Sequence, residues 1–364
     1  MATDDTMVDW SLGIVATFDL LANLDGGRKR GIEIPGTIEA VGDVAWDSGG
    51  RNHSHHIKLN ILGTIGQNFS AERIGDIQTI SSIEAPNTAK LFEAWYQYTF
   101  PNESTSVLIG LHDLNTEFYV LERASKLLHS SFGNGPEVTQ VKASLFPTTA
   151  LGAVARIAPS ERTYISTGIY DGVPGKPTDK FGTHIHFDKG DGVFFIGEAG
   201  VFDITHAMPT KVAIGIWYTT ATFEDVAGHT RDDNLGAYMI TELPLTTICA
   251  DGTLGLFLQL GISHTSLNEI GSYFGARLHW TAPFEGRDED TLSAGIAHAR
   301  INAKYRRITG LERRAETAIE LTYTYQLNNW LMLQPDVQIV IDPGSANGID
   351  DAMIAGVRII LEIP

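Results

Sequence analysis

The stretch KLFEAWYQYTFPNESTSVLIGLH, residues 90–112, decides the fold of this chain. It belongs to two segments, 89–101 and 103–113, that are each long enough for a strand and alternate apolar and polar residues, as β-strands with one apolar face do. The alternation stops in a long insertion, 113–146, which contains a helix-like piece at 117–130. A strand pair followed by such an insertion predicts a barrel with a regular wall and a hole narrowed by one special connection.

The rest of the chain repeats the alternating pattern. In 252–265, for example, Leu254, Leu256 and Leu258 share one face, while Thr253 and Gln259 share the other. Most segments reach the about 9–11 residues that a membrane-crossing strand needs, and their number is even. The sixteen predicted strands are 10–24, 34–46, 57–65, 89–101, 103–113, 148–158, 162–172, 192–202, 211–222, 234–246, 252–265, 268–284, 291–301, 314–327, 329–341 and 352–363.

The size of this barrel decides which face meets lipid. Sixteen strands enclose a lumen too wide for side chains to fill, so an apolar interior would be an unsupported void. We therefore expect the apolar face to point outward into lipid and the polar face to line water. The predicted fold is all-β: one domain, 1–364, forming a 16-stranded antiparallel transmembrane β-barrel with the connection 113–146 folded into the lumen.

Composition excludes several classes of function. The formal net charge of −18 argues against a nucleic-acid partner, because phosphate binding needs clustered Lys and Arg. The single cysteine, Cys249, excludes an internal disulfide framework and a Cys-rich zinc site. The histidine-rich run 52–56 is expected in a solvent-exposed turn rather than in a metal site, because no acidic ligand stands at a fixed spacing. We expect no metal and no cofactor.

Several stretches resemble a known family. They are LFEAWYQYTF (91–100), LIGLHDLNTEFY (108–119), HSSFGNGPEV (129–138) and the C-terminal run 316–363, with its QPD-x-Q motif and Pro-Gly turn. Together they resemble the carbohydrate-selective porins of the OprB family, and weaker similarity extends over most of the chain. The resemblance implies a sixteen-stranded barrel that passes sugars by passive diffusion. The chain departs from the family at 362–364, Glu-Ile-Pro, where such barrels commonly end in an aromatic residue.

The expected location is the bacterial outer membrane. The first ten residues, MATDDTMVDW, lack the basic start and apolar core of a signal peptide, as in a chain numbered from its mature end. The expected partners are mono- or oligosaccharides, glucose among them, and outer-membrane lipid and lipopolysaccharide; self-association stays open. A general non-selective porin is the closer alternative, because only the resemblance separates the two. A barrel enzyme is the more distant one, because no motif such as G-x-S-x-G is found.

Twelve polar residues are predicted to line the channel. Carboxylates and amides accept the hydroxyl protons of a sugar, and guanidinium groups donate in a planar fork. A mixture of Arg and Glu favours neutral polar solutes over an ion filter of one sign. The alternative is that these charges only solvate the wall. The candidates are Glu93, Gln97, Asp113, Asn115, Glu117, Arg156, Arg277, Glu316, Glu320, Gln334, Asp336 and Arg358.

Two groups of these candidates carry a spatial prediction. The last three strands are hairpin neighbours, so Glu316, Glu320, Asp336 and Arg358 are expected on one wall. Asp113, Asn115 and Glu117 belong to the insertion with Glu122, Arg123 and Lys126, and are expected where the connection narrows the lumen; a solvated surface loop is the alternative.

Overall fold

The structure is a computed structural model that describes residues 8–48, 53–66, 68–121, 127–175, 181–183, 185, 187–203, 210–247 and 252–363. Cys249 and the 122–126 part of the insertion, with Glu122, Arg123 and Lys126, lie outside the described residues.

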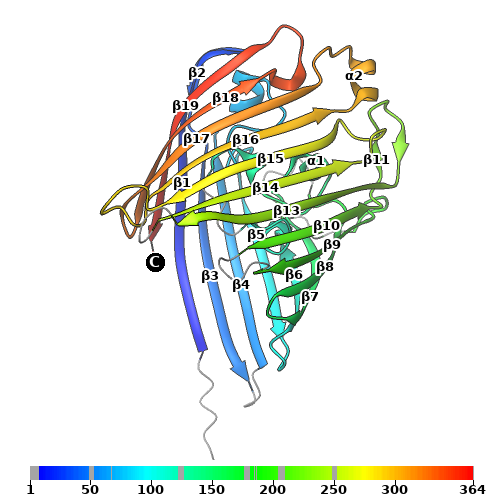
Figure 1. Cartoon of the computed structure of the whole chain (residues 1–364). Coiled ribbons are helices and arrows are strands. Elements are labelled where there is room, and N and C mark those ends of the chain that lie inside the picture. The colour runs from blue at the N-terminus through cyan, green and yellow to red at the C-terminus, as the bar shows by residue number, and fades with distance from the viewer. Residues whose placement is uncertain are drawn as a thin grey trace, which may run out of the picture.

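A closed antiparallel barrel accounts for most of the described chain (Figure 1). Its 17-stranded sheet consists of sixteen wall strands and the short β2 (Gly31–Glu33), and β19 pairs back onto β1 to close the ring. The sixteen predicted segments are confirmed as these strands. The wall consists of β1 (Val8–Gly27), β3 (Gly36–Ser48), β4 (His53–Ile65), β5 (Thr88–Thr99), β6 (Thr105–His112), β7 (Ala150–Ser160), β8 (Thr163–Asp171), β9 (Val193–Phe202), β10 (Lys211–Thr219), β13 (Asn234–Thr247), β14 (Thr253–Ser263), β15 (Ile270–Thr281), β16 (Thr291–Ile301), β17 (Ala315–Asn328), β18 (Leu331–Ile341) and β19 (Asp350–Ile363).

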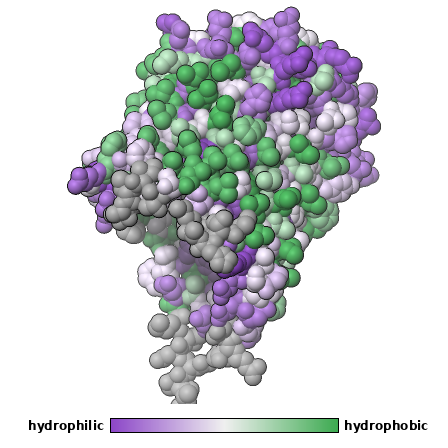
Figure 2. All heavy atoms as spheres, viewed as in Figure 1, coloured by the Kyte–Doolittle hydropathy of each residue, from purple (hydrophilic) through white to green (hydrophobic). Residues whose placement is uncertain are grey.

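The apolar face of the wall points outward, as predicted. On β1, the side chains of Trp10 and Leu12 are 71% and 64% exposed, whereas Asp19 on the opposite face is 0% exposed. Figure 2 shows hydrophobic residues gathered across the middle of the barrel and hydrophilic ones at its ends. An apolar outer band around a polar interior is the arrangement that a bilayer requires of a barrel.

The two ends of the barrel differ in the length of their connections. At one end neighbouring strands are joined by the turns 100–104, 161–162 and 329–330. At the other end the connections 66–87 and 113–149 are far longer. Since outer-membrane barrels have short periplasmic turns and long extracellular loops, the long-loop end is the extracellular one.

The helical segments are short. Within the described residues no helix is long and apolar enough to cross a membrane. The extracellular connections also carry the two-residue strands β11 (Phe223–Glu224) and β12 (Thr230–Arg231). The helical turns are η1 (Ser70–Ile74), η2 (Leu114–Thr116), η3 (Ser130–Phe132), α1 (Pro136–Thr139), α2 (Ala303–Thr309) and η4 (Pro343–Ser345).

The insertion packs against the inner wall, but not as the helix predicted for 117–130. Its described parts, 117–121 and 127–130, contain no α-helix. The reason is visible in their backbone: the N–H of Tyr119 donates to the carboxylate of Glu198, and the N–H of Leu128 donates to Glu320, rather than to carbonyls one helical turn back. The side chains of Leu114 and Phe118 are buried in one apolar cluster with residues of the wall.

The histidine-rich run 52–56 is also placed differently from the prediction. Its described residues, 53–56, begin strand β4 instead of forming an exposed turn. The ring of His55 stacks on Trp46 at 4.9 Å between centroids, and its Nδ1 lies 2.7 Å from the hydroxyl of Tyr96. This pairing across neighbouring strands holds the segment extended. In the described part of the chain, no cluster of His, Cys, Asp or Glu is arranged to hold a metal ion.

Candidate functional site

Two loops are held against the inner wall of the barrel by its polar side chains. These loops are 66–87, between β4 and β5, and 113–149, between β6 and β7. Most of the predicted channel residues contact one of them. The structure separates the twelve candidates into groups on different parts of the wall.

Glu316 and Glu320 on β17 bind loop backbone. The carboxylate of Glu316 accepts hydrogen bonds from the N–H groups of Ile77 at 2.9 Å and Gln78 at 3.1 Å. The carboxylate of Glu320 accepts from the N–H groups of Leu128 at 2.5 Å and His129 at 3.0 Å. Both glutamates are almost fully buried. They therefore anchor loops 66–87 and 113–149 to the same strand.

The seam that closes the barrel carries a buried ion pair. Arg358 on β19 donates from Nε and Nη2 to the two oxygens of Asp19 on β1, at 2.7 and 2.8 Å. The hydroxyl of Ser81, in loop 66–87, donates to Asp19 at 2.5 Å. Gln334 lies opposite Arg358 on β18. The seam and the loop are thus stabilised by one network, a role for Arg358 that its position in the sequence does not reveal.

The remaining predicted residues, Arg277 on β15 and Asp336 on β18, are also connected to the loops, Asp336 through its neighbour Gln338. Arg277 donates to the carbonyl oxygen of Phe132, and its guanidinium carbon lies 5.6 Å from the centroid of that ring. Gln338 donates at 3.1 Å to the carbonyl of Ile80 and at 2.9 Å to Asp336. With Glu316, Glu320 and Arg358, Asp336 forms the predicted polar group of the last three strands.

Glu93, Asp113 and Asn115 meet where β6 leads into the insertion. The Nζ of Lys58 lies 3.1 Å from Glu93, which also accepts from the backbone N–H of Asp113 at 3.3 Å. Asp113 in turn accepts from the N–H of Asn115 at 2.9 Å and caps η2. Burial, with the charge of Glu93 adding to it, raises the pKa of Asp113 to about 7. These residues fix the departure of the loop from the wall.

Gln97, Glu117 and Arg156 line an open cavity that we call the inner vestibule. It has a volume of about 410 Å³, within the ~300–1,000 Å³ of small-molecule sites. It opens among the short turns, at the periplasmic end, and Phe202 and Lys211 complete its lining. Burial raises the pKa of Glu117, while the charge of Arg156 acts in the opposite direction.

Among the described residues that line it, the inner vestibule has one aromatic residue, Phe202, which packs with Arg156 against the buried ring of Tyr164. The guanidinium carbon of Arg156 lies 4.1 Å from the ring centroid of Tyr164, which stacks against Phe202 at 5.2 Å. The Nζ of Lys211 donates at 2.7 Å to the carbonyl of Val120 in the insertion. The cavity therefore presents carboxylate, amide and guanidinium groups beside an aromatic face, next to the folded-in loop.

Glu198 on β9 is a central residue that the sequence analysis missed. It accepts from the hydroxyls of Tyr164 and Tyr238, each at 2.6 Å, and from the backbone N–H of Tyr119 at 2.9 Å. Tyr164 lies across Gly200, where a Cβ would be 2.2 Å from the ring. The available signal in the sequence was that Glu198 is the only charged residue of the segment 192–202.

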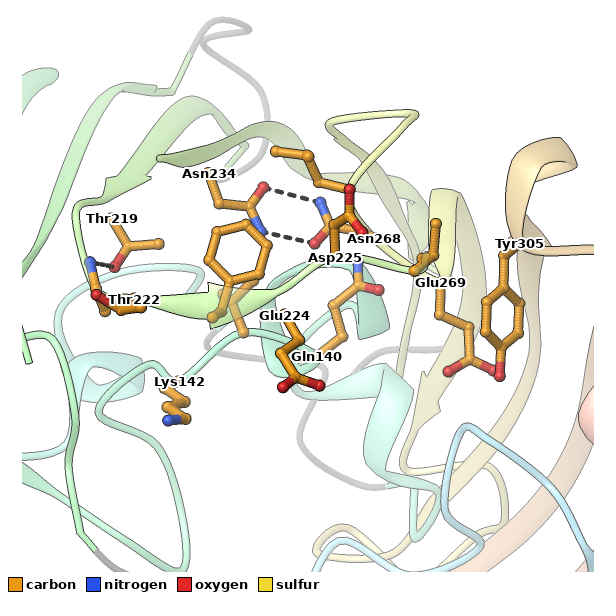
Figure 3. A pocket seen from close by; sticks show the side chains of 15 residues that line it. Gln140, Lys142, Thr219, Thr222, Glu224, Asp225, Asn234, Asn268, Glu269 and Tyr305 are labelled. Atoms are coloured by element: carbon orange, nitrogen blue, oxygen red, sulfur yellow. Dashed lines mark hydrogen bonds between the residues drawn. The ribbon is translucent and has the colours of Figure 1, made fainter. Parts of the chain in front are cut away.

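A second cavity, the outer vestibule, lies among the extracellular loops (Figure 3). Its volume is about 310 Å³, and Gln140 of the insertion lies on its wall. Asn234 and Asn268 exchange two hydrogen bonds of 2.7 and 2.9 Å across it. Burial raises the pKa of Glu269, which faces the hydroxyl of Tyr305.

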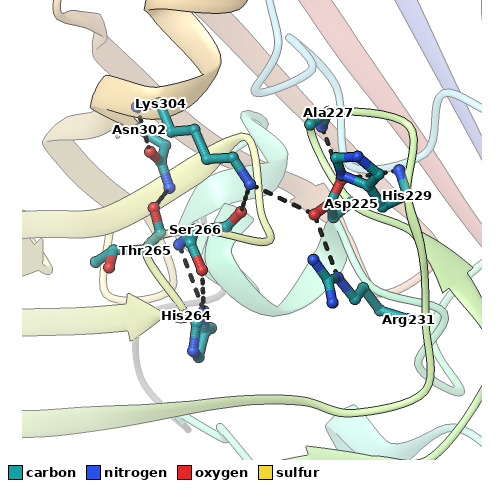
Figure 4. A network of polar contacts seen from close by, with 9 residues as sticks. All are labelled: Asp225, Ala227, His229, Arg231, His264, Thr265, Ser266, Asn302 and Lys304. Carbon is teal, nitrogen blue, oxygen red and sulfur yellow. Dashed lines mark hydrogen bonds and ion pairs between the residues drawn. The ribbon is translucent and has the colours of Figure 1, made fainter.

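Asp225 joins two extracellular loops, 220–233 and 302–314, beside this cavity (Figure 4). It accepts from the backbone N–H groups of His229 at 3.0 Å and Ala227 at 2.8 Å, and lies 3.4 Å from both Arg231 and Lys304. These donors, the His229 N–H foremost, hold the pKa of Asp225 well below its usual range. The outer vestibule thus has a fixed rim.

Comparison with known proteins adds independent findings. A family model described as "Carbohydrate-selective porin, OprB family" matches residues 43–362. Porin B of Pseudomonas aeruginosa is 23% identical over 185 residues, which are 42% of this chain and 41% of Porin B. Putative porin QuiX of Acinetobacter baylyi is 25% identical over 174 residues, which are 42% of this chain and 40% of QuiX. The chain thus spans about two fifths of the length of these relatives in the matched regions.

Solved structures share the fold. The high-pH structure of Pseudomonas putida OprB has a TM-score of 0.87 with 18% sequence identity, over 97% of this chain and 94% of that one. The outer membrane channel DcaP of Acinetobacter baumannii has a TM-score of 0.61 with 8% identity, over 98% and 97% of the two chains. At these identities the likeness establishes a common barrel architecture.

Proposed function

Because this chain belongs to the carbohydrate-selective porin, OprB family, we propose that it is a passive diffusion channel for sugars, glucose and other monosaccharides among them, across the Gram-negative outer membrane. The barrel supplies the path through the bilayer, and the family assignment supports a channel rather than an enzyme. The matched relatives share only part of their length with this chain, so its substrates are inferred from its own polar groups.

The observation that carries the proposal is the inner vestibule. Glu117 and Gln97 offer acceptors and amide donors, Arg156 offers a planar donor fork, and the ring of Phe202 offers an apolar face. A sugar ring has hydroxyls around its edge and C–H groups on its faces, and these two kinds of contact match it. The balance of acidic and basic side chains favours a neutral solute over an ion.

The outer vestibule supplies a second stage of the same path. Sugar would be held weakly among amide and aromatic groups at the extracellular end, pass beside loop 113–149 and be held again at the periplasmic end. Several weak sites suit conduction, because binding must allow both entrance and release. In this proposal loops 66–87 and 113–149 narrow the lumen to the size of a sugar.

Liposome swelling tests the proposal. Proteoliposomes are placed in isotonic glucose, a larger saccharide or an amino acid of the same size as glucose, and the initial swelling rates are compared. We expect glucose to enter faster than the amino acid. Equal rates would indicate a general non-selective porin, and the absence of swelling would refute the channel.

A substitution then tests the vestibule itself. Arg156→Gln removes the guanidinium fork and should weaken sugar inhibition of the ion current about 2- to 10-fold, the effect of one hydrogen bond of ~0.5–1.5 kcal/mol. Arg162→Gln is the matched control, since Arg162 is an exposed arginine in the nearby turn 161–162. If both variants bind sugar as the wild type does, the inner vestibule is not the sugar site.

We also propose that the outer face contacts outer-membrane lipid, including lipopolysaccharide. Self-association belongs to the same proposal, and native mass spectrometry in mild detergent would detect it as masses that are multiples of one chain.

A further inference from the structure

A basic groove lies on the outer side of the barrel at its extracellular end. It is formed where β14 and β16 end and β15 and α2 begin, and its volume is about 570 Å³. Four cations, Arg300, Lys304, Arg306 and Arg307, surround it. Such a concentration of positive charge is unexpected in a chain with a net charge of −18.

Strand register places this groove on the lipid-facing side. Ile262 pairs with Ser272, and Ser272 pairs with Arg300, so the three side chains stand in a row on the outer face. Ile262 is 60% exposed, and the small Ser272 leaves a depression between its larger neighbours. Further along the same strands and the same face, Phe274 and Ile296 are exposed apolar residues of the membrane band.

The arginines of the groove have N–H donors without a partner in the described part of the chain. The Nε of Arg306 is buried without a hydrogen-bond acceptor among the described residues. Arg300 and Arg307 are exposed and form no ion pair within the described ranges. By contrast, Arg313 of the same connection lies 2.8 Å from Asp342. Guanidinium groups that lack a carboxylate partner keep N–H donors that solvent can reach, so an anion supplied from outside would complete the site.

The helix that carries these arginines is held in place. The side chain of Asn302 accepts from the N–H of Lys304 at 2.8 Å at the start of α2, and Gly310 ends the helix in the left-handed conformation. Lys304 donates to the carbonyl of Ser266 at 2.9 Å and lies 3.4 Å from Asp225 (Figure 4). The ammonium group of Lys304 is therefore already used to hold α2 in place, and Arg300, Arg306 and Arg307 are the groups that can bind a ligand.

We propose that this groove binds the phosphorylated headgroup of an outer-leaflet glycolipid, with the headgroup phosphate between Arg300, Arg306 and Arg307 and acyl chains along the wall at Ile262. Arginine is suited to phosphate because its planar fork donates two parallel hydrogen bonds. The hydrophilic end of the barrel lies directly above its hydrophobic band in Figure 2, which is where a lipid presents its phosphate. Lipopolysaccharide combines phosphate and acyl chains in this leaflet. A site for free phosphate would need no apolar wall.

Native mass spectrometry of the detergent-purified protein tests the site, with lipid A as the probe. The comparison is between wild type, Arg300→Gln, Arg306→Gln and the double variant. We expect the affinity for lipid A to fall roughly five-fold for each single variant and roughly 25-fold for the double variant. A roughly five-fold loss is about the effect of removing one basic side chain near an anionic lipid surface. Arg162→Gln, at the periplasmic turns, should bind lipid A as the wild type does.

Three further arms separate the possible ligands and failures. Dephosphorylated lipid A should bind weakly to the wild type, and inorganic phosphate should not displace lipid A at comparable concentrations. Displacement by phosphate would overturn the assignment to a lipid, and unchanged affinity in the double variant would overturn the site. All three groove variants should keep the heat-dependent gel shift of a folded barrel and wild-type glucose swelling. Their lipid result therefore stands apart from the sugar-channel proposal.

Discussion

Removing the carboxylate of Glu320 should release loop 113–149 from the wall. In Glu320→Ala the backbone N–H groups of Leu128 and His129 lose their acceptors, at a site where both loop and wall are buried. An unsatisfied buried N–H costs about 1–3 kcal/mol, so the docked loop should be destabilised by about 2–6 kcal/mol. A loss of about 3 kcal/mol raises the ratio of released to docked loop roughly 150-fold.

Planar-bilayer recording measures this change directly. If the docked loop narrows the lumen, Glu320→Ala should show a larger or more variable single-channel conductance, and saccharides larger than glucose should enter liposomes faster. Glu320→Gln is the matched control, because its amide oxygen keeps one acceptor while its NH₂ group cannot accept. Its effect should be intermediate.

Glu320→Ala also carries a clear refutation. If the variant folds, as shown by its heat-dependent gel shift, and yet keeps wild-type conductance and size cut-off, the carboxylate does not anchor the constriction. In that case the polar face of β17 would line the barrel without controlling the width of the channel. A change in sugar inhibition of the current without any change in conductance would instead favour direct sugar contact by Glu320.

Two other predictions follow from buried charges. Arg358→Gln leaves Asp19 as a buried carboxylate without its partner and should destabilise the barrel by about 3–5 kcal/mol, measured as a lower temperature for the gel shift. Adding Asp19→Asn to the same chain should restore part of the lost stability. An unchanged gel-shift temperature in Arg358→Gln would contradict the stabilising role of this ion pair. Asp113 has a pKa raised to about 7 from its ordinary 3.8, so its contribution to stability is fully present below about pH 4 and is lost as pH rises through about 7. Asp113→Asn should therefore reduce the fall in thermal stability between pH 4 and pH 8. If thermal stability falls equally with pH in the variant and the wild type, Asp113 is not the group responsible.

The strands of the wall could be predicted because the pattern that specifies a strand lies in neighbouring residues of the sequence. A strand shows its two faces in consecutive residues, so the outward Trp10 and the inward Asp19 could be assigned without knowing the neighbouring strand. Because sixteen strands enclose a lumen too wide for side chains to fill, the apolar face could then be assigned to lipid. The inward placement of Glu316, Glu320 and Arg358 followed from the same alternation.

The partners of these residues were not predictable in the same way. Glu320 meets the backbone of Leu128 and His129, and Glu316 meets the backbone of Ile77 and Gln78. A backbone N–H is the same at every position, so no residue type marks it as a partner, and the contacts join segments about two hundred residues apart. The helix predicted for 117–130 does not form in its described parts, 117–121 and 127–130, for the same reason: wall carboxylates, absent from the local sequence, accept from the N–H groups of Tyr119 and Leu128.

The insertion is consequently held from two sides of the ring. Glu198 on β9 binds the N–H of Tyr119, and Glu320 on β17 binds those of Leu128 and His129, with β10, β13, β14, β15 and β16 between the two strands. The loop is thus fixed at Tyr119 and at Leu128, on two different sides of the ring. Its path is set by where the wall offers acceptors, because a buried N–H must find one. The position of the insertion is therefore specified by the wall and the loop together, and substitution of either carboxylate should move the insertion while the sixteen strands remain paired.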